Sequence, residues 1–338
     1  MTEPAQQLAR LGDLLTPYAV RTAATLRLAD HVAAGHERVD ELAAAAGADP
    51  RALRALLRQL AVAGVVALDP DGRIALTPVG ELLRSDVPGS WRAHLALDGA
   101  PGLMQRAWAA LPDAVRTGRA GFPDVAGGGF WEVVGGDPEL TASFAAHLGD
   151  WAAQWVPVVA GLLPLEDARL VVDVGGGSGV LLGALLDRHA HLRGVLVDLP
   201  AATEQAARHL AGCGVADRVD LRPGSFFDPL PGGGDVYLLA QVLHDWPDPE
   251  ANALLARVAE AAGPGARVVV VERLADAGAG HPAMDLLMLN LFGSRERTHE
   301  EYSALARAAG LHPVSAVPTD VGLHLLTFAV PTAPEGAP

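Results

Sequence analysis

Apolar residues in the first part of the chain recur every three or four positions. This spacing runs through LARLGDLLTPYAV, TLRLADHVAA, VDELAAAAG and RALRALLRQLAVAGVV, all within residues 4–86, and it predicts helices that bury one face. Gly47, and Asp49 followed by Pro50, mark the end of one helix and the start of the next. In LDPDGRIALTP an Asp-Gly turn separates two short apolar runs, which predicts a small hairpin. We therefore expect residues 1–100 to form a helical domain that resembles a winged helix.

A second helical region follows, with apolar residues at helical spacing from Trp91 to about Leu163. Three glycines at 127–129 and the sequence GGDP at 135–138 interrupt this region and predict loops. Such loops border a pocket in some proteins and are plain surface turns in others. We assign residues 101–165 to a helical linker that contributes to a substrate pocket.

The pattern changes after Asp167, where short β-branched apolar runs alternate with helical segments. These runs are RLVVDVGGGSG, GVLVDLP, GDVYLLAQVL, RVVVVERL and LHLLTFAV. Continuous apolar strands that alternate with helices are typical of a parallel sheet covered on both faces. The predicted fold class is therefore α/β, with a Rossmann-like, doubly wound domain over residues 166–332.

The charge of the chain argues against nucleic acid as a partner. Among 338 residues, 40 are acidic and 25 basic, which gives a net charge of −15 and repels phosphate backbones. A winged helix with Arg51, Arg54 and Arg58 on its third helix is nevertheless compatible with a DNA-binding regulator. Residues 1–100 contain 10 arginines and 12 acidic residues, whereas DNA-binding domains usually carry a basic face.

Cysteine content and the apolar pattern indicate where the protein resides. Cys213 is the only cysteine, so no intramolecular disulfide forms, and we expect a reducing, cytoplasmic environment. The first residues, MTEPAQQLARLGDLL, lack the basic start and apolar run of a signal peptide. Apolar stretches elsewhere are too short to span a membrane, so no membrane association is expected.

A glycine-rich turn follows the first predicted strand of the second domain. Asp173 precedes glycines at alternate positions, Gly175, Gly177 and Gly179, and a helical segment starts at the next residue, Val180. A dinucleotide fingerprint requires glycine where Val180 stands. The alternate pattern instead suits a nucleotide-like cofactor without a pyrophosphate, because bare backbone can approach the ligand closely.

A second acidic residue strengthens this interpretation. Asp198 ends the next predicted strand, where its carboxylate can accept hydrogen bonds from both hydroxyls of an adenosine ribose. A glycine turn on its own can be purely structural. Together with Asp173, Asp198 and the sheet pattern, we interpret the turn as a cofactor site.

The chain resembles the small-molecule O-methyltransferases of plants and bacteria, including those that tailor polyketides, which use S-adenosylmethionine. The resemblance is carried, in order, by DVGGGSG, VDLP, GSFFDPLP, LHDWPD, VVVVE and GSRERT. It implies a helical dimerisation domain, a homodimer, and a methyltransferase domain of the Rossmann-like type. It also implies that the cofactor contacts Asp173, Gly175, Gly177, Asp198 and Leu199, with Ser225 and Phe226 beside its adenine.

Methyl transfer to a hydroxyl requires a base. A phenol has a pKa near 10 and is mostly protonated at neutral pH, so a nearby side chain must remove its proton. His244 follows the predicted strand DVYLLAQVL at the edge where doubly wound sheets bind ligands, and imidazole has a suitable pKa. Glu272 closes the strand VVVVE on the same edge and can hold the imidazole in one tautomer.

The resemblance assigns the same residues. His244 matches the general base of the family, and Glu272 and Glu296 match the two glutamates that bracket it. An alternative is that His244 and Asp245 cap the helix that starts near Pro247, and that Glu272 is a solvated strand end. Asp245 therefore stays open between a role in orienting the site and a role as a capping acid.

Candidate contacts to the acceptor lie on two predicted helices. In FAAHLGDW, Phe144, Leu148 and Trp151 fall on one helical face, and MDLLMLN supplies Met288 and Asn290. Aromatic residues and methionine at helical spacing are often core residues instead.

Two further functions remain compatible with the sequence. Some polyketide-tailoring relatives catalyse hydroxylation or rearrangement without transferring a methyl group; these often lack the histidine, which is present here at His244. The other alternative is the winged-helix regulator. No metal site is expected, because no cluster of histidine, cysteine and carboxylate residues has ligand spacing along the chain.

Overall fold

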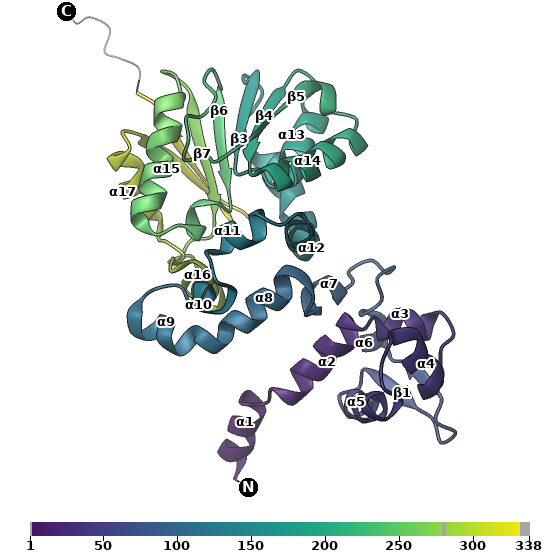
Figure 1. Ribbon diagram of the computed structural model, residues 1–338. Coiled ribbons are helices and arrows are strands. Elements are labelled where there is room, and N and C mark those ends of the chain that lie inside the picture. The colour runs from purple at the N-terminus through teal and green to yellow at the C-terminus, as the bar shows by residue number, and fades with distance from the viewer. Residues whose placement is uncertain (1, 279–281, 332–338) are drawn as a thin grey trace, which may run out of the picture. The chain divides into compact units, whose positions relative to one another are not determined.

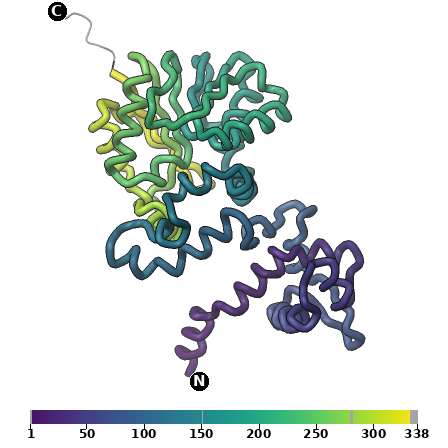
Figure 2. Tube along the Cα trace, in the orientation of Figure 1, coloured from purple at the N-terminus to yellow at the C-terminus, as the bar shows by residue number. Residues whose placement is uncertain are grey.

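The computed structural model describes residues 2–278 and 282–331. The chain divides into two compact units, Met1–Gln105 and Arg106–Pro338. Figure 1 labels their helices and strands, and Figure 2 traces the path of the chain. No helix in the described part of the chain has both the length and the apolar composition needed to cross a membrane.

The first unit is helical with one small hairpin, as its apolar pattern predicts. Its elements are α1 (Glu3–Leu11), α2 (Leu15–Thr25), α3 (Leu28–Ala33), α4 (Val39–Ala46), α5 (Pro50–Val62), β1 (Val66–Leu68), β2 (Ile74–Leu76), α6 (Pro78–Glu81) and α7 (Arg92–Leu95). The Asp49 carboxylate caps α5 by accepting the N–H groups of Arg51 and Ala52, and β1 pairs with β2 in antiparallel register. Leu42, Leu53 and Ile74 are buried in its core, whereas α1 buries no side chain.

Along the chain, a run of helices follows α7 and precedes the first strand of the main sheet. They are α8 (Gly99–Ala107), the 3₁₀ turn η1 (Trp108–Ala110), α9 (Leu111–Thr117), α10 (Phe122–Ala126), α11 (Phe130–Gly135) and α12 (Pro138–Leu162). The Asp137 carboxylate caps α12 by accepting two N–H groups of its first turn. The glycines that the sequence marks as loops fall between α10 and α11 and at the end of α11.

A seven-stranded sheet with the order β5-β4-β3-β6-β7-β9-β8 forms the centre of the second unit (Figure 1). Its strands are β3 (Leu170–Val174), β4 (Arg193–Asp198), β5 (Val219–Pro223), β6 (Val236–Ala240), β7 (Arg267–Glu272), β8 (His312–Pro318) and β9 (His324–Ala329). Strands β3 to β7 are parallel, while β9 runs antiparallel to both β7 and β8. The α/β prediction is confirmed, but the sheet is mixed, because a short turn joins β8 to β9.

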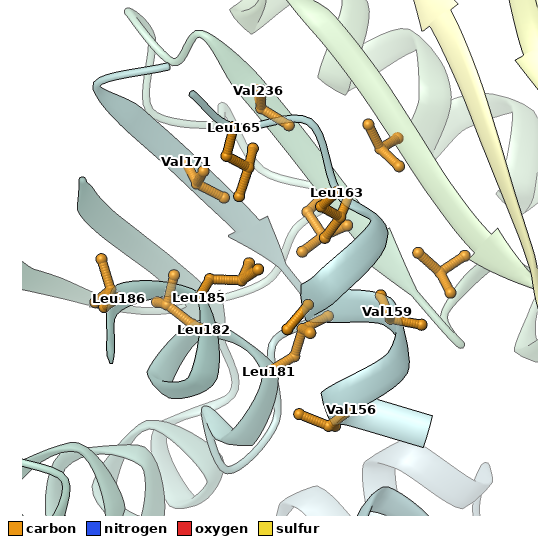
Figure 3. Close-up of a cluster of buried hydrophobic side chains, with 14 of the residues drawn as sticks. Val156, Val159, Leu163, Leu165, Val171, Leu181, Leu182, Leu185, Leu186 and Val236 are labelled. Carbon is orange, nitrogen blue, oxygen red and sulfur yellow. The ribbon is translucent and has the colours of Figure 1, made fainter. Parts of the chain in front are cut away.

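Helices cover both faces of the sheet. They are α13 (Val180–Arg188), α14 (Pro200–Gly212), α15 (Asp248–Ala261) and α17 (His299–Ala308). Helix α16 (Pro282–Phe292) instead contacts α9 and α10, and the short turns η2 (Ala216–Arg218) and η3 (Leu243–Asp245) complete the unit. Alternate strand residues point to opposite faces. Val171 therefore joins a core with α12 and α13, shown in Figure 3, and Val172 joins another with α15 and α17.

The strand order creates a switch point between β3 and β6. From β3 the chain continues outward through β4 and β5, and it then returns to the other side of β3 as β6. Ligands of doubly wound sheets bind beyond the carboxyl ends of the strands at such a point. The segments that follow β3 and β6, which carry the glycine turn and His244, therefore leave the same edge of the sheet from adjacent strands.

Candidate active site

The glycine-rich turn joins β3 to α13 in a conformation that few other residues adopt. Gly175, Gly177 and Gly179 all have positive φ angles, of 75°, 56° and 76°, which explains why glycines alternate in the sequence. A Cβ atom on Gly175 would lie 2.9 Å from Val242 and 3.4 Å from Phe226, whereas one on Gly177 would meet open space. The turn thus packs against the segments after β5 and β6 on one side and stays open at Gly177.

Asp198 is tied to the glycine turn. Its Oδ2 accepts the N–H of Gly177 at 2.7 Å, and its Oδ1 accepts the N–H of Leu199 at 2.7 Å. Burial raises the pKa of Asp198, although these two backbone donors oppose the shift. A carboxylate has about four acceptor positions, so both oxygens can still accept a ligand hydroxyl. The hydroxyl of Ser225 accepts the N–H of Phe227 at 3.2 Å.

Asp173 lies behind the turn. Its side chain is buried, and a Cβ atom on Gly176 would come within 2.6 Å of its Oδ2. That oxygen has no hydrogen-bond partner among the described residues, and burial together with Asp198 raises the pKa of Asp173 to about 7. Neither aspartate forms an ion pair with a described basic side chain, so this pair of carboxylates fits a ligand that carries positive charge and hydrogen-bond donors.

A second turn, after β6, carries the candidate base and is organised by Glu272. Oε1 of this glutamate, at the end of β7, accepts the N–H groups of Val242, Leu243 and His244 at 3.0, 2.8 and 3.3 Å. Gln241 has a φ of 56°, and its side-chain amide donates to Oε2 of Glu272 at 3.1 Å. Glu272 is fully buried, which excludes the interpretation as a solvated strand end.

Three carboxylates surround the imidazole of His244. Nδ1 lies 3.2 Å from Oε1 of Glu296 and 3.5 Å from Oε2 of Glu272, and Nε2 lies 3.4 Å from Oδ1 of Asp245. Burial lowers the pKa of His244, but the three carboxylates outweigh it and raise the pKa to about 10. Burial likewise raises the pKa values of Glu272 and Asp245 to about 7, against the opposing effect of the imidazolium. The raised pKa values mean that the cluster binds protons more tightly than the same groups do in water.

The structure excludes the capping role for Asp245. Helix α15 begins at Asp248 with Pro247 as its N-cap and has no side-chain cap. Asp245 instead lies beside the imidazole, with its Oδ1 3.4 Å from Nε2 of His244. Of the two roles left open by the sequence, the position of Asp245 supports the one within the site.

Glu296 reaches the site from the segment between α16 and α17. Its backbone N–H donates to Asp285 at 2.8 Å, and its neighbour Arg297 is fully buried. The Arg297 guanidinium donates to the carbonyls of Leu243 and Trp246 at 2.8 and 2.7 Å. Arg297 thus fixes the segment that carries His244. The sequence does not indicate this role, although Arg297 belongs to the GSRERT motif that carries the family resemblance.

The acid-base cluster also offers ligand atoms for a metal ion. Ligand atoms of His244, Glu272 and Glu296 all lie within 4.8 Å of one another, a cluster that spacing along the chain does not reveal. Three backbone N–H groups and a glutamine amide already bond to the Glu272 carboxylate, and Nδ1 of His244 faces Glu296. These bonds favour a group that holds and transfers a proton.

The predicted acceptor contacts occupy different environments. Phe144 packs against Phe130 and Trp131, with ring centroids 5.2 and 5.6 Å apart, whereas Leu148 is 39% exposed. The guanidinium of Arg273 lies 4.5 Å from the ring of Trp151. The helical face predicted for α12 is therefore divided between an aromatic cluster, solvent and a cation-π contact.

Helix α16 contributes the other two candidates from its buried side. Met288 and Asn290 are both buried. Neither polar atom of the Asn290 amide has a hydrogen-bond partner among the described residues. A Cβ atom on Gly121 would lie 2.8 Å from its Oδ1. A buried amide without a partner is costly, so Asn290 is available to bond to a polar group of a ligand.

An aromatic cluster contains Phe144, the one member that the sequence predicts as an acceptor contact. It joins residues of α10, α11, α12 and α16, namely Phe122, Phe130, Trp131, Phe144 and Phe292. Trp131 and Phe292 are stacked, with centroids 5.9 Å apart and an interplanar angle of 19°. Besides Phe144, the glycines at 127–129, which mark a loop before α11, point to this region in the sequence.

Comparisons with known proteins find two matching domain models and relatives that cover most of the chain. The O-methyltransferase domain model matches residues 108–312, and the O-methyltransferase dimerisation domain model matches residues 10–86. A 2,7-dihydroxy-5-methyl-1-naphthoate 7-O-methyltransferase of Streptomyces carzinostaticus is 43% identical over 92% of this chain and 95% of its own length. An aclacinomycin 10-hydroxylase of Streptomyces purpurascens is 40% identical over 90% of this chain and 83% of its own.

A solved structure extends the similarity to three dimensions. It is an O-methyltransferase from neocarzinostatin biosynthesis in complex with S-adenosylmethionine and 2-hydroxy-5-methyl naphthoic acid. It has a TM-score of 0.89 and 42% identity, and it covers 95% of this chain and 98% of its own. The family model and these relatives confirm the resemblance carried by the six sequence motifs. The chain belongs to the O-methyltransferase family.

Proposed function

We propose that the protein is an S-adenosylmethionine-dependent O-methyltransferase that modifies a hydroxyl of a small, aromatic, polyketide-like molecule, with His244 as the general base. One observation carries the proposal. The glycine turn and the turn of His244 follow β3 and β6, which are adjacent and parallel. A cofactor site and a base therefore share one edge of the sheet, as methyl transfer requires.

The residues around the glycine turn fit the cofactor. When bound, S-adenosylmethionine supplies a methyl group activated by a positively charged sulfonium. Asp198 would accept hydrogen bonds from the ribose, the open backbone at Gly177 would lie against the ligand, and Phe226 would pack beside the adenine. The two carboxylates without a cationic partner, Asp173 and Asp198, would attract its positive charge.

The His244 cluster would remove the proton from the acceptor. Glu296 and Glu272 hold the Nδ1 side of the imidazole, which leaves Nε2 as the atom that accepts the proton from the hydroxyl. The carboxylates stabilise the imidazolium that forms. Asp245 lies 3.4 Å from Nε2, so the hydroxyl must approach beside its carboxylate.

The aromatic cluster supports an aromatic acceptor. Ring faces and edges of Trp131, Phe144 and Phe292 pack favourably against a planar molecule, and the unpartnered amide of Asn290 would bond to one of its polar substituents. The name of a similar protein includes a naphthoate as its substrate, and that of a similar solved structure includes a bound naphthoic acid. We therefore place hydroxylated naphthoates and related bicyclic phenols first among the acceptors.

A methyl-transfer assay tests the proposal directly. Purified protein with methyl-labelled S-adenosylmethionine and a panel of hydroxylated naphthoates is expected to give a product that carries the label and to release S-adenosylhomocysteine in equal amount. The hydroxylase relative makes the mass of the product informative. A product heavier by one oxygen, without label, would place this chain with the hydroxylase and contradict the proposal.

The first unit is proposed to form a homodimer. The dimerisation-domain model matches residues 10–86, and Leu8, Leu11, Leu14 and Leu15 of the first two helices are 63 to 77% exposed. A row of exposed leucines is unfavourable in water unless a second surface covers it. The domain boundaries near residues 100 and 165 remain part of this proposal.

Sedimentation is expected to show a species of twice the 34.9 kDa chain mass. The double variant Leu11→Glu, Leu15→Glu should dissociate to monomers at micromolar concentration, because it places charges in the buried interface. Val314→Glu, at a 62% exposed position of β8, serves as the control and should remain dimeric. A wild-type protein that sediments as a monomer would contradict the homodimer.

A further inference from the structure

Helix α11 touches both halves of the proposed site. Its first two residues, Phe130 and Trp131, belong to the aromatic cluster, and the ring centroid of Phe130 lies 5.0 Å from that of Phe292. Its last residue, Gly135, lies against the side chain of Leu199, the residue that precedes α14. A helix of six residues thus connects the surface proposed for the acceptor with the segment proposed for the cofactor.

The contact between Gly135 and Leu199 leaves no room for a side chain on the helix. A Cβ atom on Gly135 would collide with Cδ1 of Leu199, and it would lie 3.6 Å from Cγ and 3.9 Å from Cβ of that leucine. Gly135 is helical and has no positive φ angle, so its backbone conformation does not require glycine. Because glycine weakens a helix relative to alanine, the close approach of Leu199 is the feature that requires glycine here.

Leu199 is also tied to the proposed cofactor site. Its N–H donates to Oδ1 of Asp198 at 2.7 Å, and the other oxygen of this carboxylate accepts the N–H of Gly177 at 2.7 Å. A ribose bound to Asp198 would therefore hold Leu199 in place. On the helix side, the carbonyl of Val134 accepts the hydroxyl of Thr141 at 2.7 Å, which attaches α11 to α12.

We propose that Leu199 is a positioning residue that transmits cofactor binding to α11, so that the bound cofactor fixes the aromatic surface that receives the acceptor. The two ligands then bind with positive cooperativity, because both stabilise the same position of α11. The inference rests on the proposed function for the identity of these ligands. The contact between Leu199 and Gly135 is a property of the protein without either of them.

Three variants change this contact in opposite ways. Gly135→Ala places a methyl group where Cδ1 of Leu199 lies, and Leu199→Ala leaves a gap beside Gly135. In the double variant the two Cβ atoms would lie 3.9 Å apart, which is an ordinary apolar contact. The double variant should therefore recover part of what each single variant loses.

Two control variants carry the same substitutions elsewhere. Gly161→Ala lies in α12, where an added Cβ meets no described atom within 4 Å. Leu305→Ala shortens a partly buried leucine of α17. Neither residue touches the glycine turn or the aromatic cluster in the contacts described above, so both controls should behave as wild type.

Hydrogen exchange tests the transmission without any acceptor. The amide exchange of a peptide that spans α11 is followed by mass spectrometry, with and without saturating S-adenosylhomocysteine. In wild type the ligand should slow this exchange by at least about threefold, because it suppresses local opening of the helix. The protection should be nearly lost in Gly135→Ala and in Leu199→Ala, and partly regained in the double variant.

Calorimetry then measures the cooperativity itself. The probe is 1,4-dihydroxy-2-naphthoic acid, a member of the proposed acceptor class, titrated with and without S-adenosylhomocysteine. Wild type should bind it about tenfold more tightly in the presence of the cofactor product, a usual size for coupling between two sites. The ratio should fall below about twofold in each single variant. A purely structural role of Leu199 would lower the melting temperature and leave this ratio unchanged.

Unchanged protection of α11 in both single variants would overturn the inference, because the ligand would then reach α11 without Leu199. An equal loss of protection in Gly161→Ala or Leu305→Ala would overturn it as well. If Gly135→Ala does not fold, Leu199→Ala decides alone, since it shortens a side chain that is only partly buried.

The inference and the proposed function fail separately. Protection of α11 that depends on Leu199, in a protein that transfers no methyl group, would support the inference and contradict the proposed function. Methyl transfer with a cooperativity that does not depend on Leu199 would do the reverse.

Discussion

His244→Asn is expected to abolish base-assisted methyl transfer while leaving the cofactor site intact. General base catalysis contributes about 10² to 10⁴ in rate, so kcat/KM for a phenolic acceptor should fall by about that factor. The asparagine keeps the small polar volume, and Glu272 still accepts the backbone N–H at position 244. Calorimetry should therefore give an affinity for S-adenosylmethionine within about twofold of wild type.

The dependence of kcat/KM on pH shows in which protonation state His244 acts. The base must be neutral to accept a proton, and the carboxylates raise the pKa of His244 to about 10 against the opposing effect of burial. Because kcat/KM reports the ionisation of the free enzyme, wild-type kcat/KM should rise from pH 7 toward about pH 10. In His244→Asn the contribution of the base should be lost, and the pH dependence that is left should follow only the ionisation of the phenolic acceptor.

Two controls separate the base from a structural effect. A nitro-substituted phenol that is ionised at pH 8 needs no base, so it should recover most of the activity lost in His244→Asn. His312→Asn, at an exposed position of β8, should behave as wild type. If His244→Asn turns over an unactivated phenol at the wild-type rate, His244 has no part in the mechanism.

The central strands could be predicted from the sequence, but the edges of the sheet could not. Strands β3, β6 and β7 are apolar runs because both of their faces are buried. Strand β8 is not an apolar run. It is exposed along its length and contains prolines at 313 and 318. An edge strand needs neither apolar faces nor every N–H group, so its composition resembles that of a loop. Strand β5, at the opposite edge, is missed for the same reason.

Residues of the site that follow strands were predicted more fully than those on helices. His244, Glu272 and Asp198 follow or end parallel strands, and topology brings such positions to one edge. Helical spacing predicted that Leu148 shares one face of the helix with Phe144 and Trp151. Its side chain is nevertheless 39% exposed. Spacing defines a face of α12 but not which neighbour covers each part of that face.

The contacts that join distant segments carry no local signature. The hydrogen bond between Glu296 and His244 depends on how the segment between α16 and α17 packs against the end of β6. Likewise, the three N–H groups that Glu272 accepts depend on the path of the chain after β6. A motif therefore identifies the base, whereas only the three-dimensional arrangement shows what sets its charge.

Asp173→Asn is expected to stabilise the protein without ligand and to weaken cofactor binding. Burial and Asp198 raise the pKa of Asp173 from 3.8 to about 7. Above pH 7 both folded and unfolded states carry the charge, and the full cost of burying it is present. This cost is lost as the pH falls from 7 toward 3.8, because the folded state then keeps the proton. Asparagine removes the cost at pH 8.

Thermal unfolding at two pH values tests the stability part of this prediction. At pH 8 the melting temperature of Asp173→Asn should exceed that of wild type by at least about 2 °C, the effect of roughly 1 kcal/mol on a unit of the size of Arg106–Pro338. The difference should shrink at pH 5, where Asp173 is protonated in the folded state. Asp220→Asn, an exposed aspartate of β5 that pairs with Arg222, should show neither effect.

Calorimetry tests the binding part, and its reason is electrostatic. The cofactor carries a sulfonium charge that its demethylated product, S-adenosylhomocysteine, lacks. Removal of the buried negative charge of Asp173 should therefore lower the affinity for S-adenosylmethionine by about tenfold, which corresponds to about 1.4 kcal/mol. The affinity for S-adenosylhomocysteine should fall by less. Equal losses for both ligands would mean that Asp173 supports the shape of the glycine turn rather than its charge. A variant that is less stable than wild type at pH 8 would contradict this prediction. It would mean that the folded protein stabilises the charged carboxylate of Asp173.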